Sequence, residues 1–155
     1  MSDIENKKLN GSVHVVLAHS YMAYMASFLL GFLLHVIFLT KISNSKFIIF
    51  LGFSFLFFAT LLIFWAQNTS RALDKSNISK ETFCQGPYKY VRMPTHFGLF
   101  LLIFGFGLLI NSFFIILFAL ISLVANKLIF IKKEEDLLSN KYGSPYLEYK
   151  KSVRF

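Results

Sequence analysis

The feature that most constrains the fold of this chain is the gathering of its apolar residues into long runs. Residues 12–40 contain no Asp, Glu, Lys or Arg, residues 47–66 form a second run, and residues 95–131 form a nearly uncharged third. About 20 apolar residues in a helix cross about 30 Å of bilayer hydrocarbon. The chain has 155 residues, 55% of them hydrophobic and 20 of them Phe. The sequence therefore predicts an all-α integral membrane protein with one membrane domain.

The third run is too long for one comfortable span, and Asn111-Ser112 near its middle favours a turn. We therefore expect four membrane-spanning helices, the last two forming a tight hairpin. Their expected ranges are residues 12–40, 47–66, 94–110 and 113–131. A single long helix over the third run is the alternative, and it would put the segments before and after it on opposite sides of the membrane.

The charges flank the apolar runs. The net charge is +8, and most of the Lys and Arg residues fall in the polar segment 67–93 and in the tail 132–155. Basic residues at the ends of spans indicate cytoplasmic loops and contact with anionic lipid head groups. The pattern argues against a nucleic-acid partner. It predicts that both termini, the polar segment and the tail share the cytoplasmic side.

A metal site is not expected from the Cys and His residues. The single cysteine, Cys84, allows no intrachain disulfide, and His14, His19 and His35 do not have the close spacing of metal ligands.

The stretch GPYKYVRMPTHFG, residues 86–98, stands between the basic segment and the third run. Pro94 predicts a helix start there. The free N–H groups of Thr95, His96 and Phe97 would then form an anion site, suited to a carboxylate. The alternative is a well-capped membrane helix with interfacial tyrosines.

The C-terminal stretch KKEEDLLSNKYGSPYLEYKKSVRF, residues 132–155, places two acidic residues just beyond the fourth span. On a continuous helix, Lys127, Ile131 and Glu134 would share one face, so an amine and a carboxylate could approach one pocket. The alternative is an acidic pair on a solvated helix end.

Together these two stretches resemble the C-terminal half of the isoprenylcysteine carboxyl methyltransferase family and of its phospholipid N-methyltransferase relatives. The usual pattern there is GPYxYVRHPxYxG, an apolar hairpin, EExxL and a terminal FGxxYxxY. The second half is matched here by Glu134, Glu135, Leu138, Tyr142, Gly143, Tyr146 and Tyr149. The sequence departs from the pattern at Met93, where the family has His, and at His96, where it has Tyr.

The resemblance implies a cytoplasmic pocket for S-adenosylmethionine, built from the loop before the third helix and the C-terminal tail. The implied cofactor-binding residues are Lys80, Glu81, Thr82, Phe83, Tyr88, Arg92, Met93, Pro94, Thr95, His96, Glu134 and Glu135. The eukaryotic enzymes hold the substrate carboxylate with an Arg whose position is occupied here by Phe130. Asn126 and Lys127, one turn earlier, are the candidate substitutes.

The expected function is thus methyl transfer from S-adenosylmethionine to a lipophilic or membrane-delivered acceptor, such as a prenylcysteine-type carboxylate, a phospholipid amine or a small thiol. One alternative is a catalytically inactive membrane protein of the same fold, which the changes at Met93 and Phe130 suggest. The other is an NADPH-dependent sterol-type reductase, whose C-terminal arrangement is similar. The sequence does not indicate the acceptor or the oligomeric state.

Overall fold

The computed structural model describes residues 3–42, 45–72 and 79–153, with side chains described from Val15 onward. The side chain of His14 and residues 73–78 of the expected polar segment lie outside this description. Within the described ranges the chain is helical, without a named strand. The elements are α1 (Asp3–Phe38), α2 (Lys46–Ala72), α3 (Lys80–Phe83), the 3₁₀ turn η1 (Gly86–Lys89), α4 (Pro94–Ile110), α5 (Phe113–Asn126), the π-helical turn η2 (Lys127–Ile131), α6 (Lys132–Tyr142) and α7 (Ser144–Ser152).

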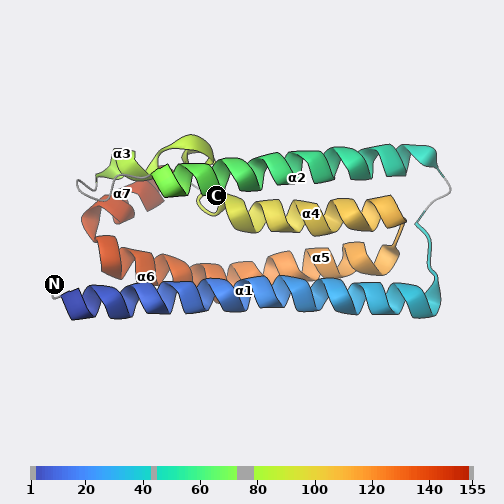
Figure 1. Cartoon of the computed structure of the whole chain (residues 1–155), viewed down its shortest axis with the longest axis horizontal. Helices are drawn as coiled ribbons and strands as arrows, with labels where there is room; N and C mark the ends of the chain where they lie inside the picture. The colour runs from blue at the N-terminus through green and yellow to red at the C-terminus, as the bar shows by residue number, and fades with distance from the viewer. Residues whose placement is uncertain (1–2, 43–44, 73–78, 154–155) are drawn as a thin grey trace.

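The long helices lie nearly parallel to one another (Figure 1). Helix α4 packs between α2 and α5, and α5 packs in turn against α1. The N-terminus, α3, α6 and α7 gather at one end of the bundle, and the turn between α4 and α5 lies at the other. The two stretches that resemble the methyltransferase pattern therefore meet at the same end.

Among the residues that the structure describes, three helical segments are long and apolar enough to cross a membrane: Val15–Phe38, Lys46–Ala72 and Phe113–Tyr142. Helix α4 is also apolar but has only 17 residues. Large apolar side chains on the outer face of α2 are exposed, Phe50, Phe53 and Phe57 among them. Such a surface is suited to contact with lipid and not with water.

A turn at Asn111 and Ser112 separates α4 from α5. Asn111 has φ 61° and ends α4 in the left-handed conformation that Asn tolerates. The Ser112 hydroxyl accepts a hydrogen bond from the Ile115 N–H at 3.3 Å and so caps α5. The Asn111 side chain also accepts from the N–H of Ile42 at 3.0 Å, which ties the α1–α2 connection to this turn.

Helices α2 and α4 approach each other closely along a stripe of small residues. The buried residues of α2 are Gly52, Ala59 and Ala66, spaced by seven, which keeps them on one side of two helices that cross at a shallow angle. A Cβ on Gly105 of α4 would lie 3.0 Å from the N of Leu56, so this glycine permits the contact.

The helices run further than the apolar runs of the sequence. Helix α2 continues to Ala72, and α5, η2 and α6 form one helical path as far as Tyr142. Hydropathy marks which residues prefer lipid, whereas helix length depends on backbone hydrogen bonding, which polar residues also support. The extra turns of α2 and α6 extend the bundle beyond its apolar part and build the walls of the site.

Candidate functional site

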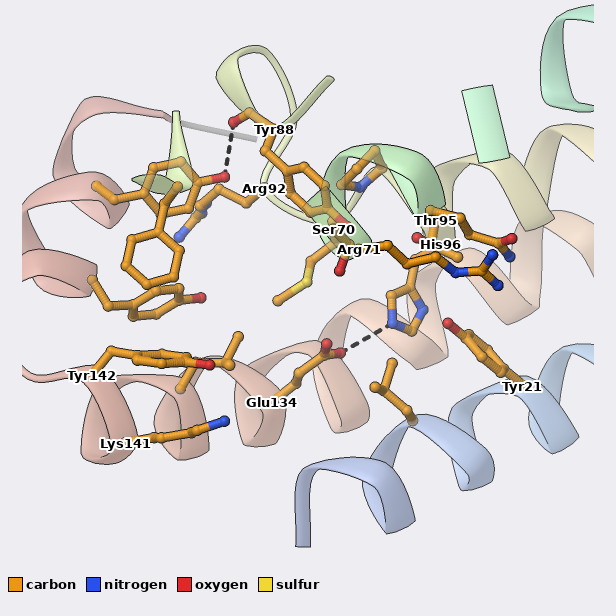
Figure 2. A pocket seen from close by; sticks show the side chains of 18 residues that line it. Tyr21, Ser70, Arg71, Tyr88, Arg92, Thr95, His96, Glu134, Lys141 and Tyr142 are labelled. Atoms are coloured by element: carbon orange, nitrogen blue, oxygen red, sulfur yellow. Dashed lines mark hydrogen bonds and ion pairs between the residues drawn. The ribbon is translucent and has the colours of Figure 1, made fainter. Parts of the chain in front are cut away.

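A cavity of about 410 Å³ lies at the end of the bundle where the stretches 86–98 and 132–155 meet. Its walls come from α1, α2, α6, α7 and the segment from Phe83 to His96 (Figure 2). The lining residues are Leu17, Tyr21, Gln67, Ser70, Arg71, Phe83, Tyr88, Arg92, Met93, Pro94, Thr95, His96, Glu134, Leu138, Lys141, Tyr142, Tyr146 and Tyr149. Its size falls in the usual range for small-molecule sites, about 300–1,000 Å³.

The Gly-Pro-Tyr segment forms a tight turn against the end of α2. Gly86 has φ +52°, and a Cβ at this position would collide with the Thr69 side chain. The following turn, Gly86–Lys89, begins with proline near its first position. This packing places Tyr88 in the cavity wall.

Helix α4 begins at Pro94, as the sequence predicts, with Met93 as its N-cap residue. One detail of the expected anion site is wrong: the N–H of Phe97 donates to the carbonyl of Met93 at 3.2 Å and is already satisfied. The first helical hydrogen bond forms at this residue because α4 closes its first turn on the N-cap carbonyl.

His96 and Glu134 form a buried pair across the cavity. The His96 Nε2 lies 3.1 Å from the Glu134 Oε2, and the two side chains are only 3% and 9% exposed. Figure 2 shows His96 on α4 and Glu134 on α6 facing each other. Residues separated by 38 positions in the sequence thus join α4 to α6.

Glu135 makes a different set of contacts from its neighbour Glu134. Its Oε1 lies 2.7 Å from Arg92 Nη1, and its Oε2 lies 2.8 Å from Lys150 Nζ. The hydroxyl of Tyr149 donates to the carbonyl of Tyr88 at 2.8 Å. Helix α7 is therefore held over the cavity by an ion-pair network and by a hydrogen bond to the Gly-Pro-Tyr turn.

Aromatic rings form one side of the cavity. The Phe83 ring centroid lies 5.2 Å from that of Tyr142, 5.5 Å from that of Tyr146 and 5.7 Å from that of Tyr149. Burial raises the pKa of the Tyr146, Tyr149 and Tyr88 hydroxyls. These hydroxyls stay protonated at neutral pH, so they are able to donate hydrogen bonds beside a wall of π faces that favours cations.

The comparison with family models decides the assignment: the model described as phospholipid methyltransferase matches residues 25–145. The chain belongs to the phospholipid methyltransferase family. No curated protein and no solved structure gives a significant match. Together with its three long apolar helices, this family membership makes the chain a membrane methyltransferase.

Eight residues implied by the resemblance to this family line the cavity: Phe83, Tyr88, Arg92, Met93, Pro94, Thr95, His96 and Glu134. The other implied residues lie outside its lining. Lys80, Glu81 and Thr82 are on α3, where Glu81 is exposed, and Glu135 is engaged by Arg92 and Lys150. The backbone N–H of Glu81 donates a hydrogen bond to the side chain of the same residue, and this lowers the pKa of the Glu81 carboxyl.

The two candidate catalytic residues also lie outside the cavity lining. Asn126 is fully buried and its Nδ2 donates to the carbonyl of Ser122 at 2.9 Å, whereas Lys127 is exposed. The π-helical turn that begins at Lys127 accommodates one extra residue per turn, so the face shared by Lys127 and Glu134 on a regular helix is broken. Among the described residues no three His, Cys, Asp or Glu side chains are placed to hold a metal ion.

Sequence reasoning missed the walls that α1 and α2 supply. Tyr21 and Leu17 come from α1, and Gln67, Ser70 and Arg71 come from the extension of α2. Only Arg71 carried a signal, as a basic residue in the polar segment. A tyrosine within an apolar run is common in membrane helices, so nothing in the sequence distinguishes Tyr21 from Tyr24.

Proposed function

We propose that the chain transfers a methyl group from S-adenosylmethionine to a lipophilic or membrane-delivered acceptor. The observation that carries the proposal is that eight residues implied by the family resemblance line one cavity at the end of an apolar helix bundle. Family membership supports methyltransferase chemistry, and S-adenosylmethionine is the usual methyl donor in such enzymes.

The side chains around the cavity suit the chemistry of this donor. Its sulfonium is a cation that the faces of Tyr142, Tyr146 and Tyr88 would stabilise. Its ammonium and ribose hydroxyls would find an acceptor in Glu134, and its carboxylate would approach the first N–H groups of α4 at Thr95 and His96. Methyl transfer is an in-line displacement, so a cavity that holds donor and acceptor about 3–3.5 Å apart supplies much of the rate.

The acceptor would reach this site from the bilayer. Large apolar side chains of α1 and α2 are exposed along the bundle, and both helices contribute to the cavity wall. A prenylcysteine-type carboxylate, a phospholipid amine and a small thiol all remain candidate acceptors, and the family favours the phospholipid amine. Acceptor binding by Asn126 or Lys127 stays a prediction, although neither lines the cavity.

Calorimetric titration of detergent-purified protein with S-adenosylmethionine, and separately with its demethylated product, tests the proposal. We expect saturable binding of both. Tyr88→Ala should weaken this binding while leaving the helical circular dichroism unchanged, because Tyr88 lies in the cavity wall at the end of the bundle. Absence of binding by folded protein would favour an inactive protein of this fold, and binding of reduced nicotinamide in its place would favour a reductase.

A further inference from the structure

His96 has one ring nitrogen that its surroundings leave unsatisfied. The residue is 2% exposed, and its Nε2 is taken by the Glu134 carboxylate at 3.1 Å. Within residues 15–42, 45–72 and 79–153, its buried Nδ1 has no hydrogen-bond partner. A buried polar atom without a partner costs free energy, so its persistence calls for a ligand.

The partner of Nε2 assigns the tautomer of the ring. A carboxylate only accepts hydrogen bonds, so Nε2 must carry the hydrogen, and Nδ1 of the neutral imidazole then presents a lone pair. If Nδ1 also carried a hydrogen, the ring would be a positively charged imidazolium. Its Nδ1–H would then be a buried donor without an acceptor, which costs free energy. The resting pair therefore holds a proton acceptor ready, and Glu134 would stabilise the imidazolium once the ring takes up a proton.

Aromatic side chains of α1 lie beside the His96 ring. The His96 centroid lies 5.9 Å from that of Tyr21 and 6.1 Å from that of Tyr24, both on α1. Figure 2 shows Tyr21 reaching toward the side of the imidazole that faces away from Glu134. The titratable groups that contact the ring in the described part of the chain include Tyr21 and Tyr24 from α1 and Glu134 from α6. Further titratable or charged side chains line the same cavity: Arg71 from α2, Tyr88 and Arg92 from the segment before α4, Lys141 and Tyr142 from α6, and Tyr146 and Tyr149 from α7.

We propose that His96 is the general base that takes a proton from an amine acceptor before methyl transfer. This inference rests on the proposed function. The protonated amine gives one proton to Nδ1, and its nitrogen lone pair then forms a bond to the methyl carbon of S-adenosylmethionine. The carbon–sulfur bond breaks, and its electron pair stays on sulfur as the neutral thioether of the demethylated product. The acceptor leaves as a methylated ammonium, and the imidazolium returns its proton to solvent.

This role distinguishes acceptor classes. A carboxylate or thiolate attacks without losing a proton in the transfer step, whereas an ammonium has no lone pair until it is deprotonated. An amine similar to that of a lysine side chain has a pKa of about 10.4, so only a small fraction of it is neutral at pH 7. A base beside the methyl donor removes that restriction.

The test uses His96→Gln, because the Gln amide N–H reproduces the donor of Nε2 toward Glu134 while nothing replaces the lone pair of Nδ1. Methyl transfer is measured in single turnovers, with S-adenosylmethionine bound and a phospholipid with a primary-amine head group in mixed micelles. We expect the variant to bind the cofactor about as tightly as the unchanged protein does. Its rate of methyl transfer at pH 7 should be lower by a factor of about 10² or more. The deficit should shrink as the pH rises toward about 10, because solvent then supplies the neutral amine.

Two further variants keep the test decisive. Tyr24→Phe removes a buried hydroxyl beside the same ring and keeps the aromatic contact, so its rate should match that of the unchanged protein. In case His96→Gln folds poorly, His96→Ala with added imidazole gives a second measurement, in which rescue of the rate supports the base.

A deficit that is the same at every pH, or a loss of cofactor affinity as large as the loss of rate, would overturn the assignment of His96 as base. Methylation of thiols or carboxylates but not of amines by the unchanged protein would overturn it and leave the proposed function intact. Failure of the unchanged protein to bind S-adenosylmethionine would overturn the proposed function itself.

Discussion

Glu134 and Glu135 are adjacent on α6 and equally buried, at 7% exposure each, yet they bind partners on different parts of the chain. Glu134 meets His96 in the cavity, whereas Glu135 does not line the cavity and pairs with Arg92 of its wall and with Lys150 of α7. Successive residues on a helix point about 100° apart, so one turn of α6 contributes both to the cavity and to the attachment of α7. The acidic pair therefore divides into one residue for the proposed chemistry and one for the local fold.

This division predicts that neutralising Glu135 weakens the attachment of α7. Glu135→Gln should lower the stability of the α7 region by roughly 2 kcal/mol, because two cations lose their counter-charge, and the figure is modest because both cations are partly exposed. Thermal unfolding in detergent, followed by circular dichroism, measures the change. The exposed neighbour Asp136→Asn is the control, expected within about 0.5 kcal/mol. Equal stability of the two variants would show that the network around Glu135 does not hold α7.

Tyr149 and Tyr146 offer a matched pair on α7. Tyr149→Phe removes the hydrogen bond to the Tyr88 carbonyl and should cost about 1 kcal/mol, with faster hydrogen exchange in α7 and in the Gly-Pro-Tyr turn. The buried Tyr146 hydroxyl has no hydrogen-bond partner in the described part of the chain, so Tyr146→Phe should leave the stability unchanged or slightly higher. The opposite ranking of the two variants would contradict the geometry of α7.

Local signals explain how much of the fold the sequence predicts. The long uncharged runs predict membrane-spanning helices because hydrocarbon excludes charge, and Asn111, Ser112 and Pro94 mark helix ends through their own backbone preferences. The resemblance to membrane methyltransferases rests on two stretches of sequence, residues 86–98 and 132–155, that meet at the end of the bundle. The match to the phospholipid methyltransferase family confirms this resemblance.

The rest depends on contacts between distant segments. Tyr21 enters the cavity because α1 packs against α5 and α6, and no local pattern of α1 specifies that packing. The π-helical turn at Lys127–Ile131 changes which residues of this turn and of α6 share a face, although the residues of the turn are ordinary helix formers. The Phe97 N–H was expected to be free because the sequence does not show how tightly the first turn of α4 closes.

Alkaline pH should destabilise the region around α7. Burial raises the pKa of Tyr88, Tyr146 and Tyr149 in the folded chain, so the unfolded chain releases these protons first as the pH passes the usual tyrosine value of about 10. The stabilisation is complete below that pH and is lost as the pH rises toward the folded pKa, with a slope of up to about 1.4 kcal/mol per pH unit for each group. Denaturant midpoints measured at increasing pH test this slope, and Tyr146→Phe should make it shallower. An identical slope in that variant would show that Tyr146 does not contribute.

The close approach of α2 and α4 makes Gly52 intolerant of a side chain. A Cβ there would lie 2.7 Å from the Leu109 N and 2.9 Å from the Gly105 O, both backbone atoms that cannot move aside by a change of rotamer. Gly52→Ala should therefore force the helices apart and cost about 1–3 kcal/mol or more, despite the higher helix propensity of alanine. Thermal unfolding in detergent measures the loss of stability. The control is Ser54→Ala on the same helix, which removes a hydrogen bond from the Ser54 hydroxyl to the Phe50 carbonyl within α2. A Gly52→Ala variant as stable as this control would mean that the two helices lie further apart than the stripe of Gly52, Ala59 and Ala66 implies.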